Sequence, residues 1–360
     1  MKNTEIGIEI RKLLHHTLTS VPSVRHLDFG TGQPGSPLEL TVDVTTDQDT
    51  HHLAVTVKRS GEPRYAREAV ALLSMELRKS SRDRYPVFAA PFISKSAVEI
   101  CLEADAGFID LAGNCRLAFD GIFIERQGQP NKFASKRSLR SLYQAKSSRV
   151  LRALLFNPNL TWKLSDLSEA AGVSIGLVFN VKKILIDREW AAFDKEGLRL
   201  VQPQRVLRDW GEHYSFGENA FFNFRSPDSP PEMESKLAER LSSEGMRYAL
   251  TSFSAFARMT PEAGGYAELI AYVDSDINRV ADLLGLKPPD SEPNVKLMLP
   301  YDEGVFYGVR QIEGIETVSQ IQAYLDLAGL KGTGEKAAEI LLTQVIQKEW
   351  QSDKISAGLF

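Results

Sequence analysis

The segment 147–202 constrains the fold of this chain more than any other part of its sequence. Its first residues repeat apolar side chains at the spacing of one helical stripe: Val150, Leu151, Leu154 and Leu155. A second short helix is expected within Leu164–Ala171 and ends at Gly172, because glycine suits the left-handed position after a helix. Ser174 is expected to cap a third helix from about Ile175 to Arg188.

The third helix has two chemically different faces. Its apolar face is made of Leu177, Val178, Val181, Ile184 and Leu185. The opposite face carries Gly176, Phe179, Lys182 and Lys183. Because successive residues turn by about 100° around a helix, one face can pack while the other enters a DNA major groove.

A short hairpin is expected directly after these helices. Trp190–Phe193 and Leu198–Val201 have the β pattern, and Asp194–Gly197 between them has the composition of a turn. Three helices followed by a hairpin make a winged helix-turn-helix. We therefore predict that residues 147–202 bind double-stranded DNA.

The predicted DNA contacts follow from this arrangement. Groove-facing polar residues are expected to be Ser174, Asn180, Lys182 and Lys183. Phe179 offers apolar contact to thymine methyl groups. Lys195 and Arg199 on the hairpin are expected to reach the DNA backbone.

A basic segment precedes the winged helix. Residues 126–152 contain eight Lys or Arg and no Asp or Glu, although the whole chain has a net charge of −4. Within it, 126–146 is predicted to be a linker, and either a solvated linker or phosphate contact explains its charge. The predicted phosphate contacts are Lys136, Arg137, Arg140, Lys146 and Arg149. If six of the eight Lys and Arg side chains neutralised phosphates, DNA binding would have a log–log salt slope of roughly −5.

The composition excludes several classes of protein. No apolar run reaches the roughly 18–20 residues that a membrane helix needs, and the N-terminus lacks the apolar core of a signal peptide. With only Cys101 and Cys115, neither a disulfide framework nor a four-cysteine zinc site can form. The histidines show no ligand spacing. We expect a cytoplasmic protein with no metal and no cofactor.

Residues 1–125 are predicted to form an α/β domain. A helix over Ile6–Leu18 is followed by two strand-like runs, Leu38–Val44 and His52–Lys58. A helix, the buried strand Pro86–Ile93, a second helix and the strand Gly107–Leu111 complete the pattern.

This order of elements resembles the restriction-endonuclease-like nuclease core. The resemblance implies an acidic residue at Asp43 and an acid-x-Lys pair ending at Lys58. The remaining acid position is Thr56, whose neutral hydroxyl cannot hold a divalent cation, so we predict an inactive domain. A carboxylate from Glu39 or Glu68 could compensate, which keeps a metal-dependent nuclease as the alternative.

The stretch Asp110–Asn114 is the most distinctive short sequence of this half. Asp and Asn favour turns, and Gly113 supplies a positive φ, which indicates a structural corner. A ligand or DNA contact is the other interpretation.

Residues 203–350 are predicted to form a second mixed α/β domain, followed by the tail 351–360. Its expected strands include Ala220–Arg225, Glu268–Val273 and Val305–Val309. The order resembles the minimal nucleotidyltransferase-like fold, but the acid-x-acid strand of that fold is missing, so no catalysis is expected. Gln320, Tyr324 and Asp326 make either a helix face with a buried tyrosine or a site in this domain.

Three stretches together resemble the abortive-infection type IV antitoxin family of transcriptional regulators. They are Asp110–Asn114; Ser148–Leu155 with Ala171–Gly176; and Val318–Leu327 with Glu335–Glu339. The resemblance implies a DNA-binding winged helix that represses its own operon. It also implies a C-terminal domain that opposes a nucleotidyltransferase-type toxin without necessarily binding it. In the simplest members the winged helix comes first, whereas here another domain precedes it.

The sequence therefore predicts an α/β multidomain protein that acts as a non-enzymatic, DNA-binding regulator of the antitoxin type. Two alternatives stay open: a nuclease targeted by the winged helix, and a scaffold whose winged helix binds protein. A homodimer is compatible with two-fold symmetric half-sites on DNA.

Overall fold

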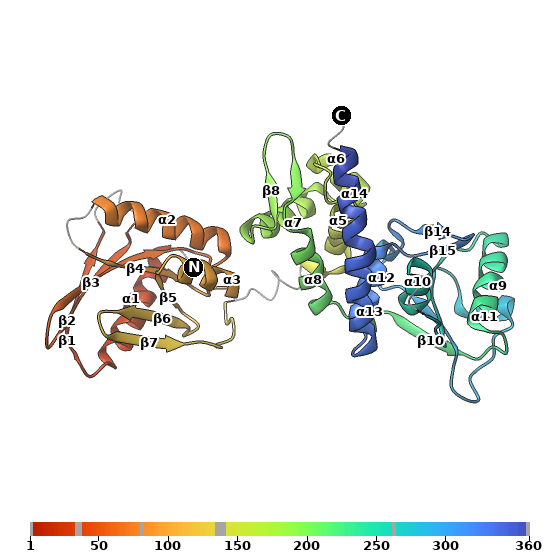
Figure 1. The fold of residues 1–360 in the computed structure, drawn as a ribbon, viewed down its shortest axis with the longest axis horizontal. Coiled ribbons are helices and arrows are strands. Elements are labelled where there is room, and N and C mark those ends of the chain that lie inside the picture. The colour runs from red at the N-terminus through yellow and green to blue at the C-terminus, as the bar shows by residue number, and fades with distance from the viewer. Residues whose placement is uncertain (1–2, 33–37, 80–82, 134–141, 261–263, 358–360) are drawn as a thin grey trace. The chain divides into compact units, whose positions relative to one another are not determined.

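The computed structural model describes residues 3–32, 38–79, 83–133, 142–260 and 264–357 (Figure 1). The chain divides into two compact units. Unit 1 comprises Met1–Leu139 with Leu185–Glu189, and unit 2 comprises Arg140–Ile184 with Trp190–Phe360. The predicted mixed α/β class is confirmed, whereas the restriction-endonuclease-like and nucleotidyltransferase-like folds and the domain boundaries stay predictions.

Unit 1 is built on a mixed seven-stranded sheet whose strands follow one another in chain order. They are β1 (Val24–Thr31), β2 (Leu40–Thr46), β3 (Thr50–Val57), β4 (Tyr85–Ala90), β5 (Gly107–Asp110), β6 (Cys115–Phe119) and β7 (Ile122–Arg126). The pairs β3–β4 and β4–β5 are parallel, and all other neighbours are antiparallel. Parallel neighbours need crossover connections, and helices supply both.

Helices cover both faces of this sheet. They are α1 (Asn3–Thr19), α2 (Pro63–Lys79) and α3 (Lys95–Glu103). Alternate residues of β4 divide between the two cores: Val87 and Ala89 pack with α1, whereas Phe88 packs with α2 and α3. This two-sided burial explains why β4 is a near-continuous apolar run in the sequence.

Unit 2 begins with the helices and hairpin of the predicted winged-helix segment, except for Leu185–Glu189 at the end of its third helix, which belong to unit 1. They are α5 (Ala145–Phe156), α6 (Leu164–Ala170), α7 (Ile175–Asp187), β8 (Ala191–Phe193) and β9 (Leu198–Leu200). Gly172 has φ of +59°, as predicted for the turn after α6. The Oγ of Ser174 accepts the Leu177 amide hydrogen at 3.4 Å, which is the predicted cap of α7. Ala191 pairs with Leu200 in the antiparallel hairpin.

The rest of unit 2 is a mixed six-stranded sheet with helices on both faces. After α8 (Pro203–His213), its strands are β10 (Ala220–Phe224), β11 (Tyr248–Leu250), β12 (Leu269–Val273), β13 (Val295–Leu299), β14 (Arg310–Ile312) and β15 (Ile315–Thr317), in the order β10-β13-β12-β11-β15-β14. One face packs on α9 (Pro230–Ser243) and α11 (Ile277–Leu284).

The opposite face of this sheet is turned to a second set of helices. They are α10 (Ser252–Met259), α12 (Gln320–Ala328) and α13 (Thr333–Leu341), and the chain continues through a π-helical turn (Leu342–Ile346) into α14 (Gln347–Ala357). Tyr272 of β12 points to this face, where its hydroxyl donates to Asp326 of α12 at 3.0 Å. The helix α12 thus lies between the sheet and the helices of the predicted winged-helix segment.

The predicted strand Val305–Val309 is wrong. The structure has a 3₁₀ turn at Glu303–Phe306, because the Asp302 side chain accepts the Gly304 amide hydrogen and caps the turn. Gly308 then adopts φ of +71°, which ends any extended run. The strands β14 and β15 follow, and they were not predicted.

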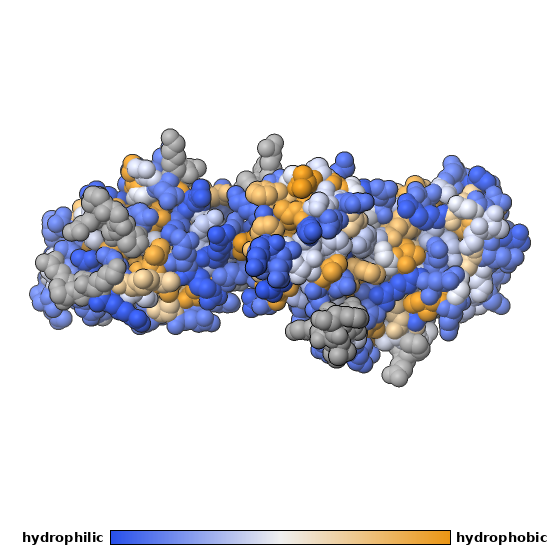
Figure 2. All heavy atoms as spheres, turned by 90° about the horizontal axis from the view of Figure 1, so that it is seen from above, coloured by the Kyte–Doolittle hydropathy of each residue, from blue (hydrophilic) through white to orange (hydrophobic). Residues whose placement is uncertain are grey.

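No helix among the described residues is both long and apolar enough to cross a membrane. Figure 2 shows a face on which hydrophilic side chains predominate and hydrophobic ones form scattered patches.

The corner Asp110–Asn114 is organised by one buried carboxylate. Asp110 is fully buried at the end of β5. Its oxygens accept the amide hydrogens of Ile93, Gly113 and Asn114 at 2.9–3.2 Å, and the Asn114 side-chain amide at 2.9 Å. Both carboxylate oxygens are therefore occupied by the protein itself, which favours the structural interpretation of this stretch.

We expect Asp110→Ala to destabilise unit 1 by about 3–5 kcal/mol, because four buried donors would lose their acceptor. Hydrogen exchange of peptides from residues 85–119 measures this loss, and the exposed Asp28→Ala in the same unit provides the control. Normal protection in Asp110→Ala would indicate that the carboxylate serves a ligand instead.

Candidate nucleic-acid interface and its buried foundation

The exposed face of α7 carries most of the residues predicted to contact DNA. Ser174, Phe179, Asn180 and Lys183 are all exposed, and Phe179 retains 52% of its side-chain accessibility. Lys195 and Arg199 are exposed on the hairpin. The structure therefore places these six residues where a DNA duplex could reach them, although their role in binding DNA stays a prediction.

Lys182 is not on the exposed face, and this part of the prediction is wrong. Only 9% of Lys182 is accessible. Its ammonium lies 4.3 Å from the ring centroid of Phe179 and 4.0 Å from that of Phe193. The ring of Phe193, on the hairpin, covers Lys182. The ammonium therefore contacts two aromatic faces instead of solvent. Lys182 thus fastens the hairpin to α7.

Lys146 lies near the start of α7 although it is far from it in sequence. Lys146 on α5 lines a shallow hollow together with Ser165, Ser168, Gly172 and Ser174. The hollow offers a phosphate one cation and several hydroxyl groups, and it also holds one carboxylate, Glu169. Two predicted DNA contacts, Lys146 and Ser174, are therefore brought to one place.

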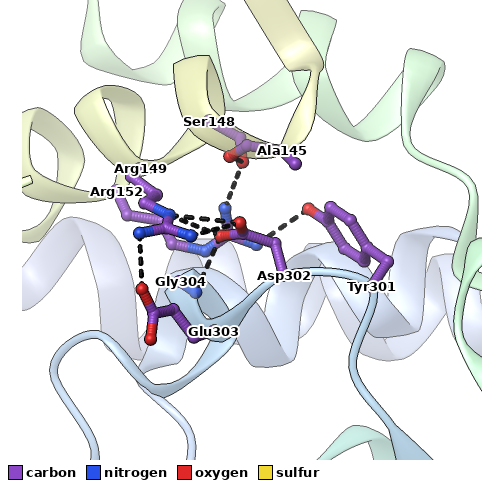
Figure 3. Close-up of polar contacts among 8 residues, drawn as sticks. All are labelled: Ala145, Ser148, Arg149, Arg152, Tyr301, Asp302, Glu303 and Gly304. Carbon is purple, nitrogen blue, oxygen red and sulfur yellow. Dashed lines mark hydrogen bonds and ion pairs between the residues drawn. The ribbon is translucent and has the colours of Figure 1, made fainter. Parts of the chain in front are cut away.

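The Arg149 side chain of α5 binds two carboxylates from the C-terminal part of unit 2 (Figure 3). Its guanidinium donates to both carboxylate oxygens of Asp302 at 2.6–2.8 Å and to Glu303 at 2.6 Å. The pair is bidentate, and only 6% of the Asp302 side chain is accessible. This charge therefore anchors α5 to the C-terminal part of unit 2, and the phosphate contact at Arg149 stays a prediction that would have to compete with this pairing.

Arg152, one helical turn further along α5, is 1% accessible, and among the described residues it has no carboxylate partner (Figure 3). Its guanidinium donates to Gln322 Oε1 at 2.5 Å, Ser148 Oγ at 2.7 Å and the Tyr301 hydroxyl at 3.1 Å. It also lies over the Trp210 ring at 4.9 Å from the centroid. Neutral acceptors and one aromatic face compensate this buried charge.

The amide of Gln322 links this charge to a buried acid. While its oxygen accepts from Arg152, its nitrogen donates to Asp326 Oδ1 at 2.8 Å. Asp326 also accepts hydrogen bonds from Tyr214 at 2.7 Å, Tyr272 at 3.0 Å and Thr251 at 2.5 Å. Burial raises the pKa of Asp326 to about 6, against these hydrogen bonds, which lower it. A continuous polar network therefore joins α5, α12 and the sheet.

The basic segment 126–152 presents fewer charges to solvent than its sequence indicates. Arg149 and Arg152 point into unit 2, whereas Lys146 is exposed. Lys136, Arg137 and Arg140 lie outside the described residues, and their phosphate contacts stay a prediction.

The two residues of the predicted nuclease pair are not brought together. Asp43 on β2 pairs in register with His52 on β3 and binds its Nδ1 at 2.7 Å. Lys58 follows the far end of β3 and binds Glu68 at 2.9 Å. Six residues along a strand span roughly 20 Å. In the described part of the chain, no three His, Cys, Asp or Glu side chains gather as a metal site.

The buried network was not recognised from the sequence as a connection between domains. Gln322 and Asp326 are four residues apart on α12, so their common helical face was visible. The contact to Arg152 was hidden because it joins residues 170 positions apart.

Residues 199–347 match a protein-family model, described as transcriptional regulator, AbiEi antitoxin, type IV toxin–antitoxin system. This region is similar to AbiEi antitoxins. The AbiEi match begins at the hairpin strand β9 and includes the sheet of unit 2 with α12 and α13. Of the three stretches that carried the resemblance, Val318–Leu327 with Glu335–Glu339 lies inside it. No curated protein and no solved structure matches the chain.

We expect the stability of unit 2 to decrease as the pH rises through about 6. A carboxyl group whose pKa lies higher in the folded than in the unfolded chain, here about 6 against 3.8, stabilises the fold when it is neutral. That stabilisation is complete at a pH below the pKa of the unfolded chain, 3.8, and it is lost as the pH rises through the folded pKa of about 6 and the carboxyl group ionises. Between pH 5 and pH 8 the loss should be roughly 1–2 kcal/mol.

Comparison with Asp326→Asn isolates this contribution. The variant cannot titrate, so the difference in unfolding free energy between it and the unchanged chain should grow in favour of the variant from pH 5 to pH 8. Urea unfolding followed by tryptophan fluorescence reports unit 2 alone, because all four tryptophans lie there. The exposed Asp282→Asn is the control, and an identical pH dependence in all three proteins would contradict the expectation.

Proposed function

We propose that the protein is a DNA-binding transcriptional regulator of the antitoxin type. The observation that carries this is the match of residues 199–347 to the AbiEi antitoxin family, in the same unit as the hairpin and residues 175–184 of α7. A helix that exposes polar side chains, followed by a short hairpin, is the arrangement that reads a major groove. The partners are double-stranded DNA and, indirectly or directly, a nucleotidyltransferase-type toxin.

The DNA-contacting residues divide into two groups. Ser174, Asn180 and Lys183 would face base edges or nearby phosphates, and Phe179 would contact thymine methyl groups. Lys146, Lys195 and Arg199 would bind the backbone. A homodimer would place two copies of α7 on neighbouring half-sites.

The adjacent lysines of α7 provide a matched test. Lys183→Ala should weaken binding to the DNA upstream of the protein's own reading frame several-fold, and should reduce the magnitude of the log–log salt slope by about one. Lys182→Met should leave that slope unchanged, because methionine can fill the space between the two rings and no exposed charge is lost. Fluorescence anisotropy at several salt concentrations measures both variants. Equal losses in the two variants would contradict the assignment of Lys183 to the DNA surface.

One observation favours a second function, a scaffold that binds protein through the same face. Ile175, Phe179 and Phe193 are exposed by 56%, 52% and 45%, so the face is partly apolar. In that case upstream DNA would not be retained by the protein, whereas Phe179→Ser would release a stable partner isolated from nuclease-treated lysate. DNA retention that is lost in Lys183→Ala would exclude this function.

A further inference from the structure

A shallow groove lies in unit 2 between α8, α12 and α13, and none of its lining residues is a predicted DNA contact. Its floor is made of small residues, Gly211, Ala328 and Ala338. Glycine inside a helix costs about 1 kcal/mol relative to alanine. A Cβ at position 211 would stand 3.2 Å from the Tyr324 ring and 3.4 Å from Ala328 Cβ, so the missing side chain leaves the groove open above Tyr324.

Tyr324 presents an unpaired polar group to this groove. Only 5% of its surface is accessible, and it lines the groove beside Gly211. Among the described residues its hydroxyl has no hydrogen-bond partner. The residue is buried while its hydroxyl is open to the groove, so the hydroxyl is placed to bind a polar group that enters there.

The rim of the groove is negatively charged. It carries Glu212, Glu335 and Glu339 against the single cation Arg208. Arg208 of α8 donates to Glu339 of α13 at 2.7 Å. Glu212 and Glu335 are exposed and form no ion pair with any described residue. Of the three carboxylates, Glu339 is paired with Arg208. The other two, Glu212 and Glu335, can bind a cation from another molecule.

We propose that this groove binds an arginine side chain of a protein partner. The planar guanidinium would donate to Glu212 and Glu335, as Arg208 does to Glu339, and to the Tyr324 oxygen. Its aliphatic stem would lie on the small residues of the floor. The groove is shallow, so it would cover only one side of a free cation. The partner's backbone on either side of the arginine must therefore add contacts with this protein.

N-acetyl-arginine amide is the probe for this site, and the full-length protein labelled with ¹³C in its tyrosine rings gives the readout. Tyr324→Phe assigns the Tyr324 signal. We expect that signal to shift saturably in the millimolar range with the arginine compound. N-acetyl-citrulline amide, which has nearly the same shape but no charge, should produce no shift.

The double variant Glu212→Gln, Glu335→Gln should weaken this titration at least fivefold, whereas the exposed Glu239→Gln on α9 should leave it unchanged. The proposal is overturned if Tyr324 does not shift, if the citrulline compound acts equally, or if the double variant titrates normally. Tighter binding of free spermidine than of the arginine compound would also overturn it, by assigning the groove to a polyamine. Retention of upstream DNA by the double variant is recorded separately, since the DNA-binding proposal does not depend on this groove.

Discussion

The buried guanidinium of Arg152 is the interaction on which the arrangement of unit 2 depends. A charge removed from water costs several kcal/mol unless its donors are satisfied. The groups that satisfy it come from α5 itself, α12, the loop before the 3₁₀ turn and the ring of Trp210 on α8. Because one planar group must meet all of them, the position of α5 against the C-terminal sheet is fixed within narrow limits.

This anchoring changes how the basic segment contributes to the proposed DNA surface. Arg149 and Arg152 form hydrogen bonds inside unit 2. The proposed DNA contacts are therefore left to Lys146 and the exposed face of α7. Lys182 also makes an internal contact, because its ammonium lies against Phe193 and so links the hairpin to α7. Several positive charges that look like DNA contacts in the sequence therefore stabilise the fold beneath the proposed DNA surface.

The elements governed by local periodicity could be predicted, and the contacts that join distant elements could not. The helices of 147–202, the turn at Gly172 and the hairpin were predicted because each depends on neighbouring residues. Lys182 was misplaced because a helical projection of α7 does not include the hairpin that covers it. Asp43 and Lys58 were paired by analogy, whereas the register of β2 on β3 gives Asp43 to His52. Tyr324 was noticed as a buried tyrosine, but the charges around it come from α8 and α13.

The asymmetry of the Gln322 amide has a consequence for how such proteins can evolve. Its oxygen must face the Arg152 guanidinium, and its nitrogen must face the Asp326 carboxylate. A substitution at any one of these three residues therefore leaves a hydrogen-bonding group of the other two without its partner. A recombination event that exchanged α5, α6 and α7 for the helices of another protein would separate Arg152 from its acceptors. Functional chimaeras are therefore expected to have their junction before Ala145, so that α5 is inherited together with the sheet and α12.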